Sequence, residues 1–251
     1  MRSSRFITAV AALALVAAPA ASFAQTQTET VERTLQLPAG GTVQLKNFSG
    51  NVRISGSTGG DVVIKAVRRA TRERLDHIKL DISESGSTIV IDANKRDEDW
   101  EERNNNVVET TFDIQVPAAA RLDIHVFSSD LTVTDVVGQQ KLETFSGDIS
   151  VAGARGALEV KSFNGSIDVD LRSAGAEPEI EAETFSGSIE ARMANDAKGR
   201  LEFTSFSGSF ESDLPLVNQS SNKRNVRADL PGGTGETLRF KTFSGELKIL
   251  K

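Results

Sequence analysis

The chain has 251 residues, a formal net charge of −6, 38% hydrophobic residues and no cysteine. Without cysteine there are no disulfides, no thiolate metal sites and no lipid-modified N-terminal cysteine. The chain is acidic, and its basic residues are dispersed rather than gathered in a stripe, so no nucleic acid is expected as a partner.

The first 24 residues have the layout of a secretory signal peptide. Arg2 and Arg5 form a positive n-region, and Phe6–Ala18 is a mostly apolar run too short to span a bilayer as a stable helix. Ser22-Phe23-Ala24 supplies a cleavage site. We therefore expect cleavage after Ala24, export to the periplasm, the medium or the cell surface, and no membrane span in the mature chain.

Residues 25–116 predict an irregular series of strands at the start of a single β-repeat domain that covers 25–251. Ile78–Ile82 and Thr88–Ile91 are separated by a glycine-containing turn and predict a hairpin. The basic run from Arg68 to Arg74 fits either a helical turn or a charged strand edge.

The most polar segment of the chain is Lys95–Asn106, KRDEDWEERNNN, which carries the only tryptophan, Trp100. We interpret it as a long exposed loop between strands. Loops of this length are often functional, so Trp100 marks a candidate loop for binding a partner.

A short motif built around Phe-Ser-Gly recurs seven times and dominates a regular array over residues 117–251. Successive copies in the array are 18–22 residues apart, except for a last interval of 37, in which Asn218–Arg227 is predicted to be an inserted loop. An apolar residue lies three places before each Phe and another four places after it. The phenylalanines are Phe48, Phe127, Phe145, Phe163, Phe185, Phe206 and Phe243, and the glycines are Gly50, Gly147, Gly165, Gly187, Gly208 and Gly245.

The spacing of the apolar residues predicts a bend inside each copy. Apolar residues alternate on both flanks, which is typical of half-buried strands. The step from three before the Phe to four after it is odd, so a continuous strand would place the two flanks on opposite faces. A bend at Phe-Ser-Gly returns both flanks to one core, and glycine supplies the backbone freedom for it.

Repeats too small to bury their own apolar face are stabilised by stacking on their neighbours. The expected fold is therefore all-β, a single-stranded parallel β-solenoid in which like residues form ladders. The alternative is an antiparallel meander or sandwich with a hairpin at each motif. We expect the phenylalanine column to face inward, because outward rings would form a long apolar stripe.

No catalytic constellation is recognisable, and no catalytic, metal or cofactor-binding residue is predicted. The only imidazoles, His77 and His125, are interpreted as structural or surface residues. Carboxylates at two-residue spacing form acidic rows, interpreted as solvated faces rather than a calcium site. The rows comprise Asp148, Asp168, Asp170, Glu179, Glu181, Glu183, Glu190 and Glu211, with Arg172 as the basic residue near them.

The chain resembles the bacterial Toastrack, or putative-adhesin, family of β-strand repeat proteins, a domain of unknown function. The resemblance rests on Val116-Pro117, on TFSGDISV at Thr144–Val151 and on the short Gly153–Gly156 spacer, and it extends from about Leu35 to Ile249. Ser129 in place of glycine departs from the pattern, as does the charged loop that contains Trp100. The resemblance implies a β-solenoid-like fold and roles in adhesion or envelope-stress signalling, with no catalytic residues to carry over.

These observations predict a non-enzymatic, exported binding or scaffold protein of the cell envelope. Its expected partner is a protein or polysaccharide of the envelope, and open strand edges at the two ends predict a capacity for self-association. The alternative is a calcium-dependent carbohydrate-active β-helix enzyme that uses the acidic rows near Asp168 and Glu181.

Overall fold

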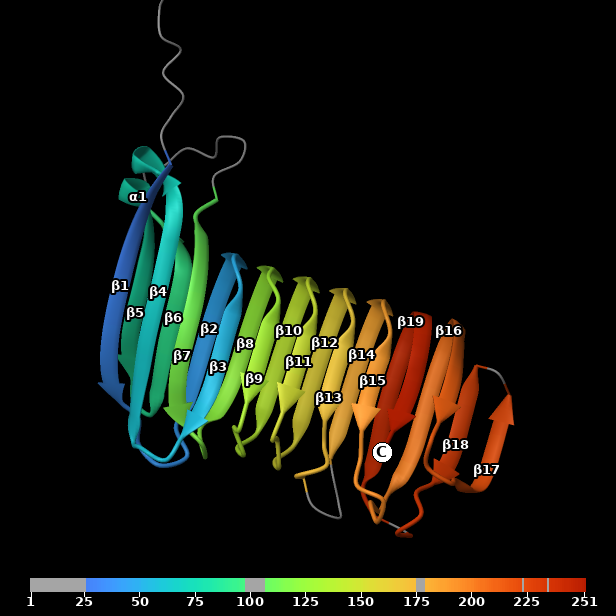
Figure 1. The fold of residues 1–251 in the computed structure, drawn as a ribbon. Helices are drawn as coiled ribbons and strands as arrows, with labels where there is room; N and C mark the ends of the chain where they lie inside the picture. The colour runs from blue at the N-terminus through green and yellow to red at the C-terminus, as the bar shows by residue number, and fades with distance from the viewer. Residues whose placement is uncertain (1–25, 98–106, 175–178, 223, 234) are drawn as a thin grey trace, which may run out of the picture.

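The computed structural model describes residues 26–97, 107–174, 179–222, 224–233 and 235–251. In these residues the chain forms nineteen strands and one short helix. Most strands pair in parallel and stack into a long, open solenoid (Figure 1). The predicted parallel β-solenoid is therefore confirmed, and antiparallel pairing is confined to the two ends.

Each repeat contributes one strand to each of two parallel arrays. The first sheet contains the strands that lead into each Phe. For example, Leu142 pairs with Ile124 on one side and with Val160 on the other. In spatial order its parallel strands are β6 (Thr88–Arg96), β2 (Thr42–Ser49), β8 (Arg121–Ser128), β10 (Gln140–Ser146), β12 (Leu158–Asn164), β14 (Ile180–Ser186) and the first halves of β19 (Thr237–Leu250) and β16 (Arg200–Ser212).

The second sheet contains the strands that follow the bend. Ile149, four residues after Phe145, pairs with Leu131 and with Ile167 in the two neighbouring rungs. In the same spatial order its parallel strands are β7 (Glu109–Pro117), β3 (Val52–Ser57), β9 (Leu131–Thr134), β11 (Ile149–Ala152), β13 (Ile167–Asp170), β15 (Ile189–Arg192) and the second halves of β19 and β16.

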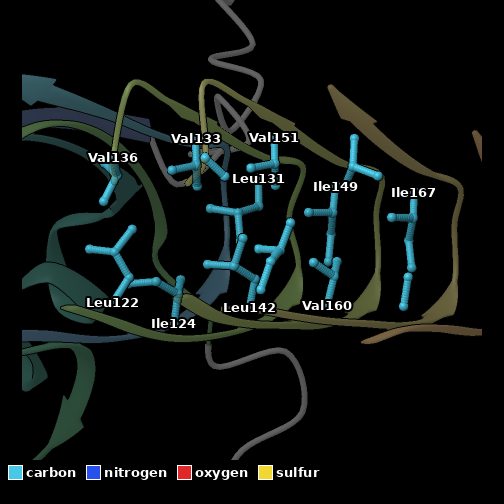
Figure 2. Packing of buried hydrophobic residues seen from close by; sticks show 14 of the residues in the cluster. Leu122, Ile124, Leu131, Val133, Val136, Leu142, Ile149, Val151, Val160 and Ile167 are labelled. Carbon is cyan, nitrogen blue, oxygen red and sulfur yellow. The ribbon is translucent and has the colours of Figure 1, made fainter. Parts of the chain in front are cut away.

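The hydrophobic core lies between the two sheets. Leu142 and Val160 of the first sheet face Val151 and Ile149 of the second, and all four are at most 1% exposed (Figure 2). Both apolar flanks of the motif therefore enter one core, as the odd step of seven residues predicts. A single rung buries too little apolar surface to be stable by itself, and stacking joins the rungs into one continuous core.

The bend is built around the glycine of the motif. A Cβ atom on Gly165 would lie 1.9 Å from the carbonyl oxygen of Gly147 in the neighbouring rung, and one on Gly187 would lie 2.2 Å from that of Gly165. No side chain fits there, so the glycine is required by the close approach of two backbones. The backbone N–H of the residue after the glycine is also hydrogen-bonded to the neighbouring rung. For example, Asp148 N–H donates to Asp130 Oδ1 at 3.0 Å.

The residue just before each Phe is buried at the inner side of the bend and is usually Thr or Ser. Thr184 Oγ1 donates to the Gly165 carbonyl oxygen at 2.9 Å, and Ser162 Oγ donates to that of Gly147 at 3.2 Å. These side chains connect consecutive bends, which aligns one rung over the next.

Thr184→Val should lower the free energy of unfolding by about 1 kcal/mol, because it keeps the shape of the side chain and removes a hydrogen bond. Urea unfolding would measure the loss. Thr132→Val, on the outward face of β9, is the matched control and should change stability by no more than about 0.5 kcal/mol. Equal effects at the two positions would contradict a role for the buried hydroxyl.

Antiparallel strands cover the N-terminal end. β1 (Thr26–Gln36) pairs with β4 (Asp61–Thr71), which pairs with β7, while β5 (Ile78–Ser85) pairs with β6 in the predicted hairpin. The basic run is divided between the end of β4 and α1 (Arg72–His77), so both expectations for it hold. Buried Arg68 of β4 connects β1 with β5, since it donates to Glu29 Oε2 at 2.6 Å and to the Ile78 carbonyl oxygen.

The C-terminal end departs from the order of the sequence. β19 lies between β14/β15 and β16, so the last repeat in the sequence occupies the second-to-last position in the stack. The prediction of an inserted loop at Asn218–Arg227 is wrong, because these residues belong to a hairpin of β17 (Val217–Asn222) and β18 (Asn225–Asp229). β18 pairs antiparallel with β16 and covers that end of the first sheet.

Candidate functional site: an exposed phenylalanine ladder

The phenylalanine of each motif lies on the outer face of the first sheet. In β10 the buried residues are Gln140, Leu142 and Thr144, so Phe145 points outward, and it is 43% exposed. The prediction of an inward-facing column is therefore wrong. The parity that places the residue three before the Phe in the core also places the Phe itself outside.

The seven rings form one continuous ladder. Neighbouring ring centroids are 4.6–4.9 Å apart and the ring planes are within 14° of parallel. The ladder therefore extends for roughly 28 Å along the solenoid. Its order in space is Phe48, Phe127, Phe145, Phe163, Phe185, Phe243 and Phe206.

Stacking determines which part of each ring a ligand can reach. Inside the ladder both faces of a ring are covered by its neighbours, so only the edges are accessible. Arg224 lies over the outer face of Phe206, with its guanidinium carbon 5.9 Å from the centroid. A sugar stacks on a ring face, which this ladder withholds. The ladder instead presents a flat apolar stripe suited to van der Waals contact with another apolar surface.

The stripe is large for an exposed apolar patch. The rings are 38–62% exposed, and at about 200 Å² per phenylalanine side chain this amounts to about 600 Å². The largest apolar patch on a typical monomer is about 300–600 Å² and is often functional. The ladder is therefore the strongest candidate for a binding surface.

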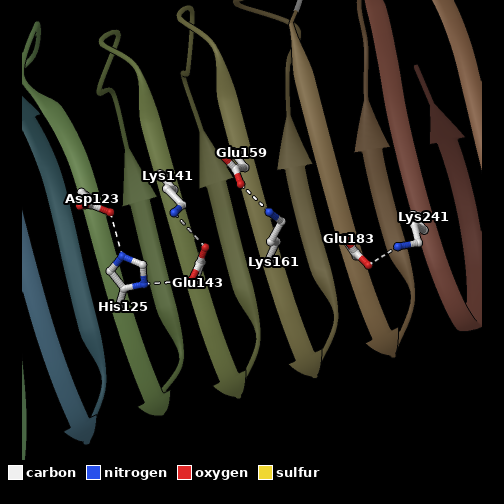
Figure 3. Close-up of polar contacts among 8 residues, drawn as sticks. All are labelled: Asp123, His125, Lys141, Glu143, Glu159, Lys161, Glu183 and Lys241. Atoms are coloured by element: carbon white, nitrogen blue, oxygen red, sulfur yellow. Dashed lines mark hydrogen bonds and ion pairs between the residues drawn. The ribbon is translucent and has the colours of Figure 1, made fainter.

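A row of charged side chains follows the ladder at a distance of two residues along each strand (Figure 3). Its members are the residues two places before each Phe, and they alternate in sign over the middle rungs. Over the middle rungs, four members of this row and three rings of the ladder line a groove of about 670 Å³: His125, Glu143, Lys161 and Glu183, with Phe145, Phe163 and Phe185. In spatial order the charged row is Lys46, His125, Glu143, Lys161, Glu183 and Lys241, and the uncharged Thr204 takes the same position in the last rung.

Ion pairs hold the charged row in place. His125 lies between two carboxylates, with Nδ1 2.9 Å from Glu143 Oε2 and Nε2 2.8 Å from Asp123 Oδ1 (Figure 3). Lys241 Nζ donates to Glu183 Oε1 at 2.6 Å. Both nitrogens of the His125 ring are thus occupied by carboxylates, which fits the predicted structural or surface role. The other histidine, His77, lies at the end of α1, with Nδ1 3.4 Å from Asp97.

The structure divides the acidic rows between the two outer faces. Asp168 and Glu190 are adjacent on the second sheet, where Arg192 pairs with both, whereas Glu181 and Glu183 are on the first sheet. Asp168 and Glu181 therefore do not converge on one site. Among the described residues, no group of three or more His, Asp or Glu side chains is placed to hold a metal ion.

One ion pair of the second sheet predicts a pH dependence. Arg172 donates to Asp170 Oδ1 and Oδ2 at 2.9 and 2.5 Å and holds the pKa of the Asp170 carboxyl below its usual value. A pKa that is lower in the folded than in the unfolded state stabilises the protein above the unfolded value of about 3.9. This contribution is lost as the pH falls through the folded pKa.

Urea unfolding between pH 7 and pH 2.5 would test this pair. Stability of the native sequence should fall on acidification, and Arg172→Gln should reduce the slope of that fall while leaving the slope above pH 5 unchanged. Identical slopes below pH 4 for the two proteins would contradict a stabilising role for the pair.

Two predicted features fall outside the described residues. These are Trp100, the candidate partner loop, and the signal peptide at residues 1–24. The part of the chain that the structure describes contains no helix of the length and apolar character needed to span a membrane. The exposed ladder and the charged row were missed from the sequence, although the parity of each strand indicates both.

The geometry thus defines an open, two-sheet parallel β-solenoid with a polar outer surface and one aromatic stripe. The chain belongs to the Toastrack family (Toastrack DUF4097), whose model matches residues 18–250. No curated protein matches the chain significantly in sequence.

A solved structure supports the fold. A crystal structure described as a putative cell adhesion protein from Clostridium sporogenes is 10% identical, with a TM-score of 0.52, and the match covers 88% of this chain and 99% of that one. A putative adhesin from Bacteroides fragilis is 12% identical, with a TM-score of 0.35, over 88% of this chain and 97% of that one. At 10% identity, the likeness to the Clostridium sporogenes structure shows a shared fold alone.

Proposed function

We propose that this protein is a non-enzymatic binding and scaffold module of the bacterial cell envelope, and that it docks its partners on the phenylalanine ladder. The observation that carries the proposal is the ladder itself. The rings stabilise the stack through contact with one another, yet about 600 Å² of their surface is exposed to water, and a covering partner best explains an apolar stripe of that size.

Three further points support this proposal. Four acidic residues of the two sheets are each paired with a basic side chain rather than gathered at one reaction centre: Glu159 with Lys161, Asp168 with Arg192, Asp170 with Arg172 and Glu183 with Lys241. The crystal structure from Clostridium sporogenes, described as a putative cell adhesion protein, has the same fold. Residues 1–24 have the layout of a cleavable export signal, which would deliver the domain to the envelope.

The test is a capture experiment from an envelope extract with the purified protein as bait. Phe145→Ser and Phe163→Ser together should abolish capture of envelope proteins with an apolar surface, because they place two hydroxyls in the middle of the apolar stripe. Arg53→Ser, on the exposed face of β3 in the second sheet, is the control and should leave capture unchanged.

Two results would contradict the proposal. Capture that is equal for the native protein and the double variant would show that partners dock elsewhere. Release of soluble fragments from an acidic polysaccharide by the purified protein, in a manner that requires calcium, would show that the protein is an enzyme.

A further inference from the structure

We propose that the outer edge of β16 in the second sheet is another docking site, at which an extended polypeptide segment is added as a β-strand. The site consists of residues 207–212, because β18 covers the outer edge of the first half of β16 only. It uses none of the rings of the ladder and so goes beyond the proposed function. Three observations support it: a series of hydrogen bonds that ends here, a core residue that is only partly covered, and an unprotected strand edge.

The hydrogen bonds between successive rungs of the second sheet run in one direction and end at β16. The residue four places after each Phe donates its backbone N–H to the rung that follows in space. Ile149 N–H donates to the Ser166 carbonyl oxygen at 3.0 Å, and Ile167 N–H donates to that of Ser188 at 2.9 Å. The equivalent donor in β16 is Phe210. In the described part of the chain no strand follows β16 in the second sheet, so the Phe210 N–H points to an open edge.

Phe210 is also the last member of a row of core residues. Its counterparts in the three preceding rungs, Ile167, Ile189 and Leu247, are at most 1% exposed. Phe210 packs against the same core but is only partly buried, because no further rung covers it. The first sheet continues beyond β16 with β18 and β17 (Figure 1). A strand added to β16 would therefore lie opposite β18 and cover Phe210.

The edge of β16 is less protected than the other strand edges. In the described residues, β1, β5, β17 and this half of β16 have a strand neighbour on one side only. Native edges avoid unwanted pairing through charged side chains, prolines or β-bulges. β1 carries three charged residues, and the pairings of β5 and β17 are interrupted by a shift of register. Residues 207–212, SGSFES, pair with β19 without a shift and contain no proline and one charge, Glu211.

The inner edge of β16 indicates which residues suit the outer one. On the inner edge, β19 places Leu247 beside Phe210 and Lys248 beside Glu211. Side chains of neighbouring strands interact on each face, and opposite charges there are favourable. The added segment therefore needs an apolar residue beside Phe210 and a lysine or arginine beside Glu211. Since residues two apart share a face, the partner is an extended segment with the pattern apolar–basic–apolar.

The shape of this end favours a single segment over a second copy of the chain. Pairing of two β16 edges about a twofold axis would place both first sheets on the same side of the joined second sheets. β18 and β17 extend each first sheet past this edge by two strands, about 10 Å, so the two hairpins would collide. A short extended segment has no such extension and fits beside β16.

A synthetic peptide with the sequence of residues 244–250, SGELKIL, tests the site. It repeats the segment that pairs with the inner edge of β16 and has the required pattern. Fluorescence anisotropy of the labelled peptide should show saturable binding to the folded protein. The Lys248→Glu version of the peptide should bind about fivefold more weakly, and Glu211→Lys in the protein should reverse this preference.

Two substitutions at Phe210 separate the hydrogen bond from the side chain. Phe210→Ala removes the ring and keeps the N–H, whereas Phe210→Pro removes both, at an edge position where proline is tolerated. The N–H points away from β19, so its loss leaves the pairing with β19 intact. The proline variant should bind the peptide about fivefold more weakly than the alanine variant, because one hydrogen bond is lost.

Amide hydrogen exchange tests the same contact without a substitution. The Phe210 N–H should exchange rapidly in the free protein and at least about tenfold more slowly with saturating peptide. Absence of peptide binding at about 1 mM, or a Phe210 N–H that is already protected in the free protein, would overturn the inference. Self-association of the free protein that is lost in Phe210→Pro would assign the edge to a second copy and would overturn it as well.

The two docking sites fail separately. The double variant Phe145→Ser and Phe163→Ser alters the ladder and should bind the peptide as tightly as the native protein. Peptide binding together with capture that is insensitive to the ladder would keep the edge site and remove the proposed function. Loss of peptide binding in the double variant would overturn a separate site at the edge.

Discussion

Gly165→Ala should destabilise the protein by at least about 3 kcal/mol, one of the two largest effects expected from a single substitution in this fold. The added methyl group would lie 1.9 Å from the carbonyl oxygen of Gly147. That oxygen belongs to the backbone of the adjacent bend and cannot rotate away. Relief of the clash therefore requires two rungs to separate, which weakens the parallel hydrogen bonds between β10 and β12 and the core behind them.

Urea-induced unfolding followed by circular dichroism would measure this loss. Gly60→Ala is the matched control, because a Cβ atom there meets no other atom within 4 Å and the backbone angle φ is not in the left-handed region. It should change stability by no more than about 0.5 kcal/mol. Similar midpoints for the two variants would show that the bends are not in close backbone contact.

Phe240→Ala should cost about 3–5 kcal/mol, as expected for a large side chain removed from a packed core. Phe240 is 1% exposed and pairs in register with Ala182 on one side and Phe203 on the other. Ala182 is already small, so nothing on that side of the new cavity is long enough to fill it.

Phe243→Ala in the same strand is the matched comparison. Phe243 is 44% exposed and stacks between Phe185 and Phe206 at 4.6 and 4.7 Å. Its loss removes two ring contacts worth about 1 kcal/mol each and leaves no cavity in the core. Thermal and chemical unfolding should therefore separate the two variants by at least about 1 kcal/mol. Equal losses would mean that the two faces of β19 are assigned the wrong way round.

These comparisons also show why the position of the phenylalanines is difficult to predict from hydrophobicity alone. An apolar residue in every rung indicates a core position when only its chemistry is considered. The alternation in β12, where Leu158, Val160 and Ser162 are buried, places Phe163 on the other face. Along a strand, geometry takes precedence over polarity, since a step of one residue reverses the direction of the side chain.

Much of the candidate site follows from the same alternation. The ladder, the buried hydroxyls next to it and the charged row are at fixed positions before each bend, so one correct parity assigns all three. Ser129 shows the limit of the motif as a rule. It replaces the glycine of the second copy and is 3% exposed. This bend therefore accommodates a buried side chain, whereas at Gly147 and Gly165 even a Cβ atom would clash with the neighbouring backbone.

The sequence by itself determined the repeating unit: two strands, one bend, the glycine that permits the bend and the parallel stacking that gives each unit a neighbour. Only the tertiary structure decided how the ends are closed and in what order the last rungs stack. All rungs present nearly the same edge, so no local signal says that β19 enters between β14 and β16. That choice depends on the β17–β18 hairpin, which covers the outer edge of the first half of β16 and leaves its inner edge for the returning chain.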